Sequence, residues 1–127
     1  MDPFIYIKPP SEMSLEAFAA FVQELFPVTG WHERESSNYY RGCYWCGDME
    51  EREIELCWLD SRGFDDYIFW LVVFSKKKRS VDQDAADEQF VDAMARIIAS
   101  KGFTTLIPED DITEKGNQNG VKYEGAG

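Results

Sequence analysis

The run Tyr67–Ser75 (YIFWLVVFS) constrains the fold of this chain more than any other segment. Its side chains are apolar at both odd and even positions, whereas a strand with one solvated face alternates apolar and polar residues. A strand of this kind needs cover on both faces. We therefore predict a central strand of a sheet, covered on both sides along part of its length.

Two amphipathic helices are predicted on either side of the central part of the chain. Ser14 is the expected N-cap of the first helix, which Pro27 ends. Asp82 or Asp84 is the expected cap of the second, which extends to about Lys101. Apolar residues recur at helical spacing in both. These stripes comprise Leu15, Phe18, Ala19, Val22, Leu25 and Phe26 in the first helix, and Ala86, Phe90, Ala93, Met94, Ile97 and Ile98 in the second.

The element order β-α-β-β-β-α-β favours an α+β fold, in which two helices pack on a mainly antiparallel sheet. Residues 1–108 are expected to form a single domain. Residues 109–127 contain few apolar side chains and are expected to be a disordered acidic tail. The remaining strands are predicted at residues 4–7, 37–46, 52–60 and 103–107, with turns at 47–50 and 60–63.

The chain is strongly acidic, with a net charge of −11 and a sequence pI near 4.4. The tail from residue 109 holds five acids and two bases, so residues 1–108 still carry −8. Such a field repels phosphate backbones and anionic lipid and speeds encounter with basic proteins. We therefore expect a basic protein partner, no membrane and no direct contact with nucleic acid.

Three features of the sequence favour a cytoplasmic location. The N-terminus lacks a basic segment followed by a long apolar stretch, so no signal peptide is predicted. The longest apolar run, Ile68–Phe74, has seven residues, against roughly 20 for a membrane span. The odd number of cysteines suits a reducing compartment.

His32, Cys43, Cys46 and Cys57 contain the ligand types of a Cys₃His zinc site. Their spacing is unfavourable, because residues three apart in a regular strand point to opposite faces. Acids that follow Cys46 would raise a thiol pKa, which disfavours a redox pair. We therefore expect thiols packed beside a hairpin and no cofactor, with a zinc- or thiol-containing protein as the alternative.

No arrangement typical of an enzyme is found. His32 is the only histidine, and we expect it in an exposed loop. Carboxylates are too abundant in turns and caps to single out an acid–base pair. No phosphate-binding glycine loop occurs. The basic run Lys76–Arg79 is interpreted as a solvated strand end near acids.

Aromatic side chains interleaved with carboxylates are the strongest functional signal, and we predict that they bind a partner. Rings supply buried area in an interface, and carboxylates accept hydrogen bonds from arginine and lysine. Since a strand buries alternate residues, about half of these aromatics are expected in the core. The candidate contact residues are Tyr39, Tyr44, Glu50, Glu51, Glu53, Glu55, Trp58, Asp60, Phe64, Asp65 and Asp66.

The pattern S-x-N-Y-x-x-G-x-Y, here from Ser36 to Tyr44, is followed by a strand and then by Asp60, Gly63 and residues 65–70 (DDYIFW). Across residues 36–75 the chain resembles small bacterial cytosolic proteins, among them immunity proteins that neutralise polymorphic or contact-delivered toxins. The resemblance implies an acidic surface that docks onto a basic toxin domain, and it transfers no individual contact residue.

The sequence therefore predicts a non-enzymatic immunity protein that inhibits a toxin by direct binding. Two alternatives stay open. The first is the metal or thiol protein described above. The second is an acidic nucleic-acid mimic, an adaptor that would compete with DNA for a basic groove.

Overall fold

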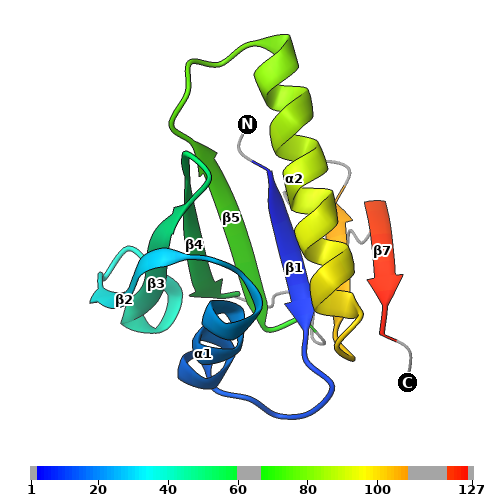
Figure 1. The fold of residues 1–127 in the computed structure, drawn as a ribbon. Coiled ribbons are helices and arrows are strands. Elements are labelled where there is room, and N and C mark those ends of the chain that lie inside the picture. Colours follow the sequence, from blue (N-terminus) through cyan, green and yellow to red (C-terminus); the bar gives the residue numbers. More distant parts are fainter. Residues whose placement is uncertain (1–2, 60–66, 109–119, 126–127) are drawn as a thin grey trace.

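The computed structural model describes residues 3–59, 67–108 and 120–125, and it confirms the α+β fold (Figure 1). In these residues the sheet order is β2-β3-β4-β5-β1-β6-β7, and all neighbouring strands pair antiparallel. The elements are β1 (Phe4–Lys8), α1 (Leu15–Leu25), β2 (Thr29–Glu35), a short 3₁₀ turn (Tyr40–Gly42), β3 (Cys43–Met49), β4 (Arg52–Trp58), β5 (Phe69–Ser75), α2 (Val81–Ala99), β6 (Thr104–Pro108) and β7 (Gly120–Glu124).

Serine side chains begin both helices. The Ser14 hydroxyl accepts a hydrogen bond from the Ala17 amide at 3.1 Å, as predicted for α1. Ser80 caps α2 through the Gln83 amide at 3.0 Å, so the expected Asp82 or Asp84 cap is wrong. Both aspartates lie instead in the first turn, where their negative charge interacts favourably with the helix dipole and stabilises the helix. Neither described helix is long and apolar enough to cross a bilayer.

Both helices cover the same face of the sheet (Figure 1). Phe18 of α1 stacks on Phe69 of β5, with ring centroids 4.8 Å apart. The stripe expected on α2 is partly wrong, because Ala86 and Ala93 are exposed and Ile97 is 41% exposed. The helix buries Asp87, Val91, Met94, Ala95, Ile98 and Ala99 instead.

The central strand β5 has the position and cover that the sequence predicts. It is the fourth of the seven ordered strands. Phe69, Leu71 and Val73 lie in the core beneath the helices. Val72 belongs to a second cluster on the opposite face, with Phe4, Tyr6, Tyr67 and Leu106.

The β2–β3–β4 region differs most from the prediction. His32, expected in a loop, lies in β2, which pairs with β3 despite its polar sequence. Tyr39 and Tyr40 precede β3 rather than belonging to it. The hairpin turn lies at Glu50 and Glu51, and both have positive φ, 50° and 61°.

The structure also differs from the expected disordered tail at Gly120–Glu124, which forms β7 against β6. The Tyr123 hydroxyl donates a hydrogen bond to Asp92 of α2, and the Arg96 guanidinium lies 4.9 Å from the Tyr123 ring centroid. One aromatic side chain thus anchors a strand that composition alone does not reveal. Residues 109–119 and 126–127 lie outside the described residues.

Candidate partner-binding surface

We call the sheet face opposite the helices the open face. The β3–β4 register pairs Tyr44 with Cys57, Cys46 with Glu55, and Asp48 with Glu53. Paired residues point to the same side of an antiparallel sheet. The neighbouring β5 partners of Glu53 and Glu55 are Phe74 and Val72, which lie in the second cluster. The three acids therefore share the open face with that apolar cluster.

Glu55 is the most enclosed acid of this surface. It is half-buried, and the Tyr39 hydroxyl donates a hydrogen bond to its Oε1. Burial raises the pKa of Glu55, while the bond from Tyr39 opposes that rise and the neighbouring Glu53 adds to it. Burial and the Glu55 contact in turn raise the pKa of Tyr39. The Tyr39 hydroxyl therefore keeps its proton and remains a hydrogen-bond donor to the Glu55 carboxyl group.

Tyr39 and Tyr44 form an aromatic pair beside Glu55. Their rings stack with centroids 4.0 Å apart and an interplanar angle of 14°. Both side chains are half-buried, so each leaves ring surface available. The structure thus brings together three of the predicted contact residues, Tyr39, Tyr44 and Glu55, although Tyr39 lies outside the strand in which it was expected.

Trp58 belongs to the other side of the sheet. Its ring packs against Phe69 at 5.1 Å, within the core beneath the helices. The Arg41 guanidinium lies 4.2 Å from its ring centroid. Trp58, a predicted contact residue, therefore points away from the face that holds Glu53 and Glu55, because its odd spacing from them reverses its direction.

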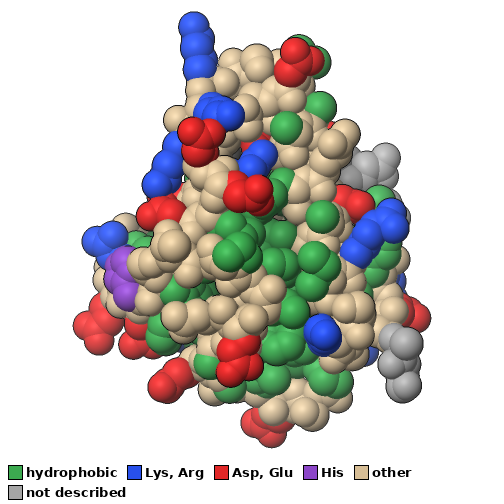
Figure 2. All heavy atoms as spheres, viewed as in Figure 1, with side chains coloured by type: hydrophobic (Ala, Val, Ile, Leu, Met, Phe, Trp, Pro, Cys, Tyr) green, Lys and Arg blue, Asp and Glu red, His purple; other side chains and the backbone are tan. Residues whose placement is uncertain are grey.

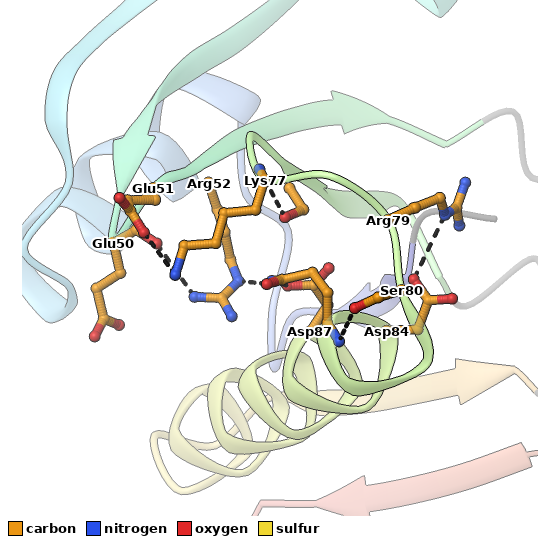
Figure 3. Close-up of polar contacts among 10 residues, drawn as sticks. Glu50, Glu51, Arg52, Lys77, Arg79, Ser80, Asp84 and Asp87 are labelled. Carbon is orange, nitrogen blue, oxygen red and sulfur yellow. Dashed lines mark hydrogen bonds and ion pairs between the residues drawn. The ribbon is translucent and has the colours of Figure 1, made fainter.

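Acidic side chains of the β3–β4 hairpin form ion pairs with the basic run that follows β5. Lys77 Nζ lies 2.9 Å from the Glu51 carboxylate, and Lys76 Nζ lies 2.5 Å from that of Asp48. Figure 3 shows the Lys77 side chain extended toward Glu51 at the hairpin turn. Lys77 lowers the pKa of Glu51. These pairs partly neutralise the hairpin tip, while the Glu50 side chain remains exposed.

Sequence reasoning missed two acids on β2. Glu33 and Glu35 are exposed, and neither forms an ion pair within the described part of the chain. Figure 2 shows acidic side chains gathered on the side of the molecule where β2 and β3 lie, with the histidine beside them. Residues 29–58 hold seven acids and three bases. No alternating apolar pattern marks β2, so only its density of charge could have indicated it.

The four alternative metal ligands are not brought together. Cys43 packs toward the helices, whereas the β-ladder directs Cys46 and Cys57 to the open face. Among the described residues, no three His, Cys, Asp or Glu side chains are grouped to hold a metal ion. Cys43 and Cys46, three residues apart, thus point to opposite faces of the sheet, as their spacing predicts.

Cys46 and His32 nevertheless touch. Cys46 Sγ lies 3.7 Å from His32 Nε2, and His32 Nδ1 lies 2.6 Å from the Gly30 carbonyl oxygen. A carbonyl only accepts, so Nδ1 carries the proton and Nε2 accepts from the thiol. Burial and then Glu53 raise the pKa of Cys46, and burial raises that of Cys57 to about 12. Both sulfurs are therefore neutral thiols at neutral pH.

Four of the predicted contact residues, Asp60, Phe64, Asp65 and Asp66, lie outside the described residues. The acidic residues considered below are described residues alone. Glu53 and Glu55 on β4 share the open face with the tyrosine pair, whereas Glu33 and Glu35 on β2 lie on the helix side of the sheet.

Comparisons with protein families, with characterised proteins and with solved structures found no match to this chain.

Proposed function

We propose that this protein is an immunity-type inhibitor, which neutralises a basic toxin domain by covering it with the β2–β4 end of the sheet. The carrying observation is that Glu33, Glu35 and Glu53 have no cationic partner among the described residues. By contrast, Lys76 and Lys77 pair with hairpin acids. Unpaired carboxylates suit arginine and lysine side chains of a partner: Glu53 shares the open face with the stacked tyrosine pair, and Glu33 and Glu35 lie on the helix side of the β2 edge.

The proposed mode of action is binding rather than catalysis. The raised pKa values of Cys46 and Cys57 disfavour a thiolate nucleophile. Cytoplasmic inhibition of a bacterial toxin is the setting that the resemblance over residues 36–75 implies. Charge would act mainly on the association rate and on the choice of partner.

The adjacent open reading frame in the source genome provides the direct test. Its product is expressed from an inducible promoter with and without this chain. We expect growth arrest that co-expression relieves, and a complex of the two purified proteins by titration calorimetry. A harmless product, or a toxic one that this chain neither binds nor neutralises, overturns the immunity assignment.

Charge reversal then tests the surface. The Glu53→Lys/Glu55→Lys double variant should slow association about tenfold at low salt, since steering contributes roughly 10 to 10³ in rate. The matched control is Glu12→Lys/Glu88→Lys, which makes the same charge change at exposed positions outside this surface. Equal slowing in both variants would show a general field effect and refute the assigned surface.

A further inference from the structure

The free edge of β2 is the feature that the proposed function leaves unused. In the described part of the chain, β2 is the terminal strand of the sheet and pairs with β3 (Figure 1). An edge strand presents unpaired N–H and C=O groups, which can pair with another strand. A bulge interrupts the register between Thr29 and His32, so the regular part of the edge follows it.

The hydrogen bonds between β2 and β3 show which backbone groups of β2 point away from the sheet. The Ser36 amide donates to the Gly42 carbonyl at 2.9 Å, which extends the Glu35–Cys43 register by one pair. Inward-bonded and outward-facing residues alternate along an antiparallel strand. Arg34, two residues before Ser36, is therefore bonded inward. The N–H and C=O groups of Glu33 and Glu35 point outward.

The two sides of this edge differ in charge. Glu33 and Glu35 are paired with Trp45 and Cys43, which pack on the helix side of the sheet. Arg34 is paired with Tyr44 on the open face. A strand added to this edge would therefore meet two carboxylates on one side, and His32 with Arg34 on the other.

We propose that the partner docks by adding a β-strand to β2, with lysine or arginine beside Glu33 and Glu35 and uncharged residues on the opposite side. This inference rests on the proposed function and specifies its geometry. The backbone supplies paired hydrogen bonds, and the alternating side chains supply selectivity. A second copy of this chain is a poor occupant, because two β2 edges would bring carboxylates against carboxylates.

A synthetic peptide in which lysine and threonine alternate is the probe for this site. Binding is measured by fluorescence anisotropy and by amide chemical shifts of the labelled protein. We expect the largest shifts at the amides of Glu33 and Glu35. N-methylation of the peptide amides that face β2 should weaken binding at least about tenfold, a change of about 1.4 kcal/mol. A peptide alternating glutamate and threonine should not bind.

Two variants of the protein separate the contribution of backbone hydrogen bonds to peptide binding from that of side-chain charge. Glu33→Pro removes an outward N–H and leaves the bonds to β3, so it should weaken binding of the lysine peptide at least about tenfold. Glu33→Thr/Glu35→Thr keeps the backbone and should remove the salt dependence of binding. Glu12→Thr/Glu88→Thr is the matched control, and circular dichroism checks that each variant is folded.

The outcomes distinguish this inference from the proposed function. Peptide binding that tolerates N-methylation, amide shifts away from β2, or a dimer formed through β2 would each overturn edge docking. Suppose the toxin partner loses affinity with Glu53→Lys/Glu55→Lys but not with folded Glu33→Pro. The function then stands and the edge geometry is wrong. If neither variant affects a neutralised toxin, both the surface and the edge are wrong.

Discussion

The Nε atom of Arg52 lies 2.8 Å from Oδ1 of Asp87, and this ion pair joins β4 to α2 within the protein (Figure 3). Their side chains are only 13% and 6% exposed. Gln83 also donates to Asp87 at 2.9 Å, and the Arg52 guanidinium lies over the Phe90 ring. Such an ion pair is costly to break, because removal of either side chain leaves the charge of the other buried without a partner.

Asp87→Ala should therefore lower the free energy of unfolding by about 3–5 kcal/mol. Arg52→Met/Asp87→Leu should lose much less, because neither charge then remains buried. Urea unfolding measures both variants. Asp84→Ala is the control, since the Asp84–Arg79 pair is exposed and should contribute less than about 1 kcal/mol. Equal losses for the single and double replacements would contradict the buried-charge explanation.

The half-buried Glu55 predicts a pH dependence of stability. Burial raises its pKa above the ordinary 4.5, so the folded protein holds this proton more tightly than the unfolded chain does. The stability from Glu55 is fully present below its ordinary pKa and is lost as the pH rises through the folded pKa. Glu55→Gln should flatten this part of the profile, measured by urea unfolding in steps of pH. An unchanged profile would show that Glu55 ionises normally.

Removing the Tyr39 hydroxyl tests the bond to Glu55. Tyr39→Phe should raise the pKa of Glu55 further and lower stability at neutral pH by about 1–3 kcal/mol. The loss should shrink in acid, where a protonated Glu55 no longer needs the donor. Carboxyl NMR titration and unfolding measure the two effects. Tyr40→Phe is the control, because Tyr40 is 47% exposed. A loss independent of pH would instead indicate altered packing of the tyrosine stack.

The β3–β4 turn can be improved. Glu50 and Glu51 both adopt positive φ, a conformation that Asn and Gly tolerate better than Glu. Glu50→Asn/Glu51→Gly should stabilise the protein by about 1 kcal/mol in thermal or urea unfolding. Lys77→Ala measures the exposed pair with Glu51 that this variant also removes. Net destabilisation, with a large effect of Lys77→Ala, would show that the ion pair dominates the turn.

The thiols should react slowly in the folded protein. Cys57 is 1% exposed and its pKa is raised to about 12, so little thiolate forms near neutral pH. Cys46 is 4% exposed, and Cys43 is only half-buried. We expect iodoacetamide to modify Cys43 first and Cys57 last, with all three modified in urea. Mass spectrometry follows each site, and rapid labelling of native Cys57 would contradict its burial.

Local patterns predicted the two helices and the central strand because each carries a strong periodic signal. The spacing of apolar residues in α1 and the doubly apolar β5 leave few alternatives. The buried face of α2 differs from the predicted apolar stripe because it contains Asp87, whose partner Arg52 lies 35 residues away in sequence. No pattern within the helix reveals that pairing.

The candidate site was harder to predict than the fold. Tyr39, Tyr44, Glu53 and Glu55 were identified from composition, but the faces they occupy follow from register. The shift of the turn to Glu50–Glu51 moved β3 along the chain and left Tyr39 outside it. A strand reverses side-chain direction at every residue, so the open face required an exact register.

By itself, the sequence determined the α+β class, the helix caps' approximate positions, the central place of β5 and the strongly acidic character of the chain. These properties arise from local spacing and from summed charge. Only the tertiary structure decided that polar β2 is an edge strand and that Tyr123 anchors β7 to α2. Each depends on backbone pairing between distant segments, which hydrophobic periodicity does not encode.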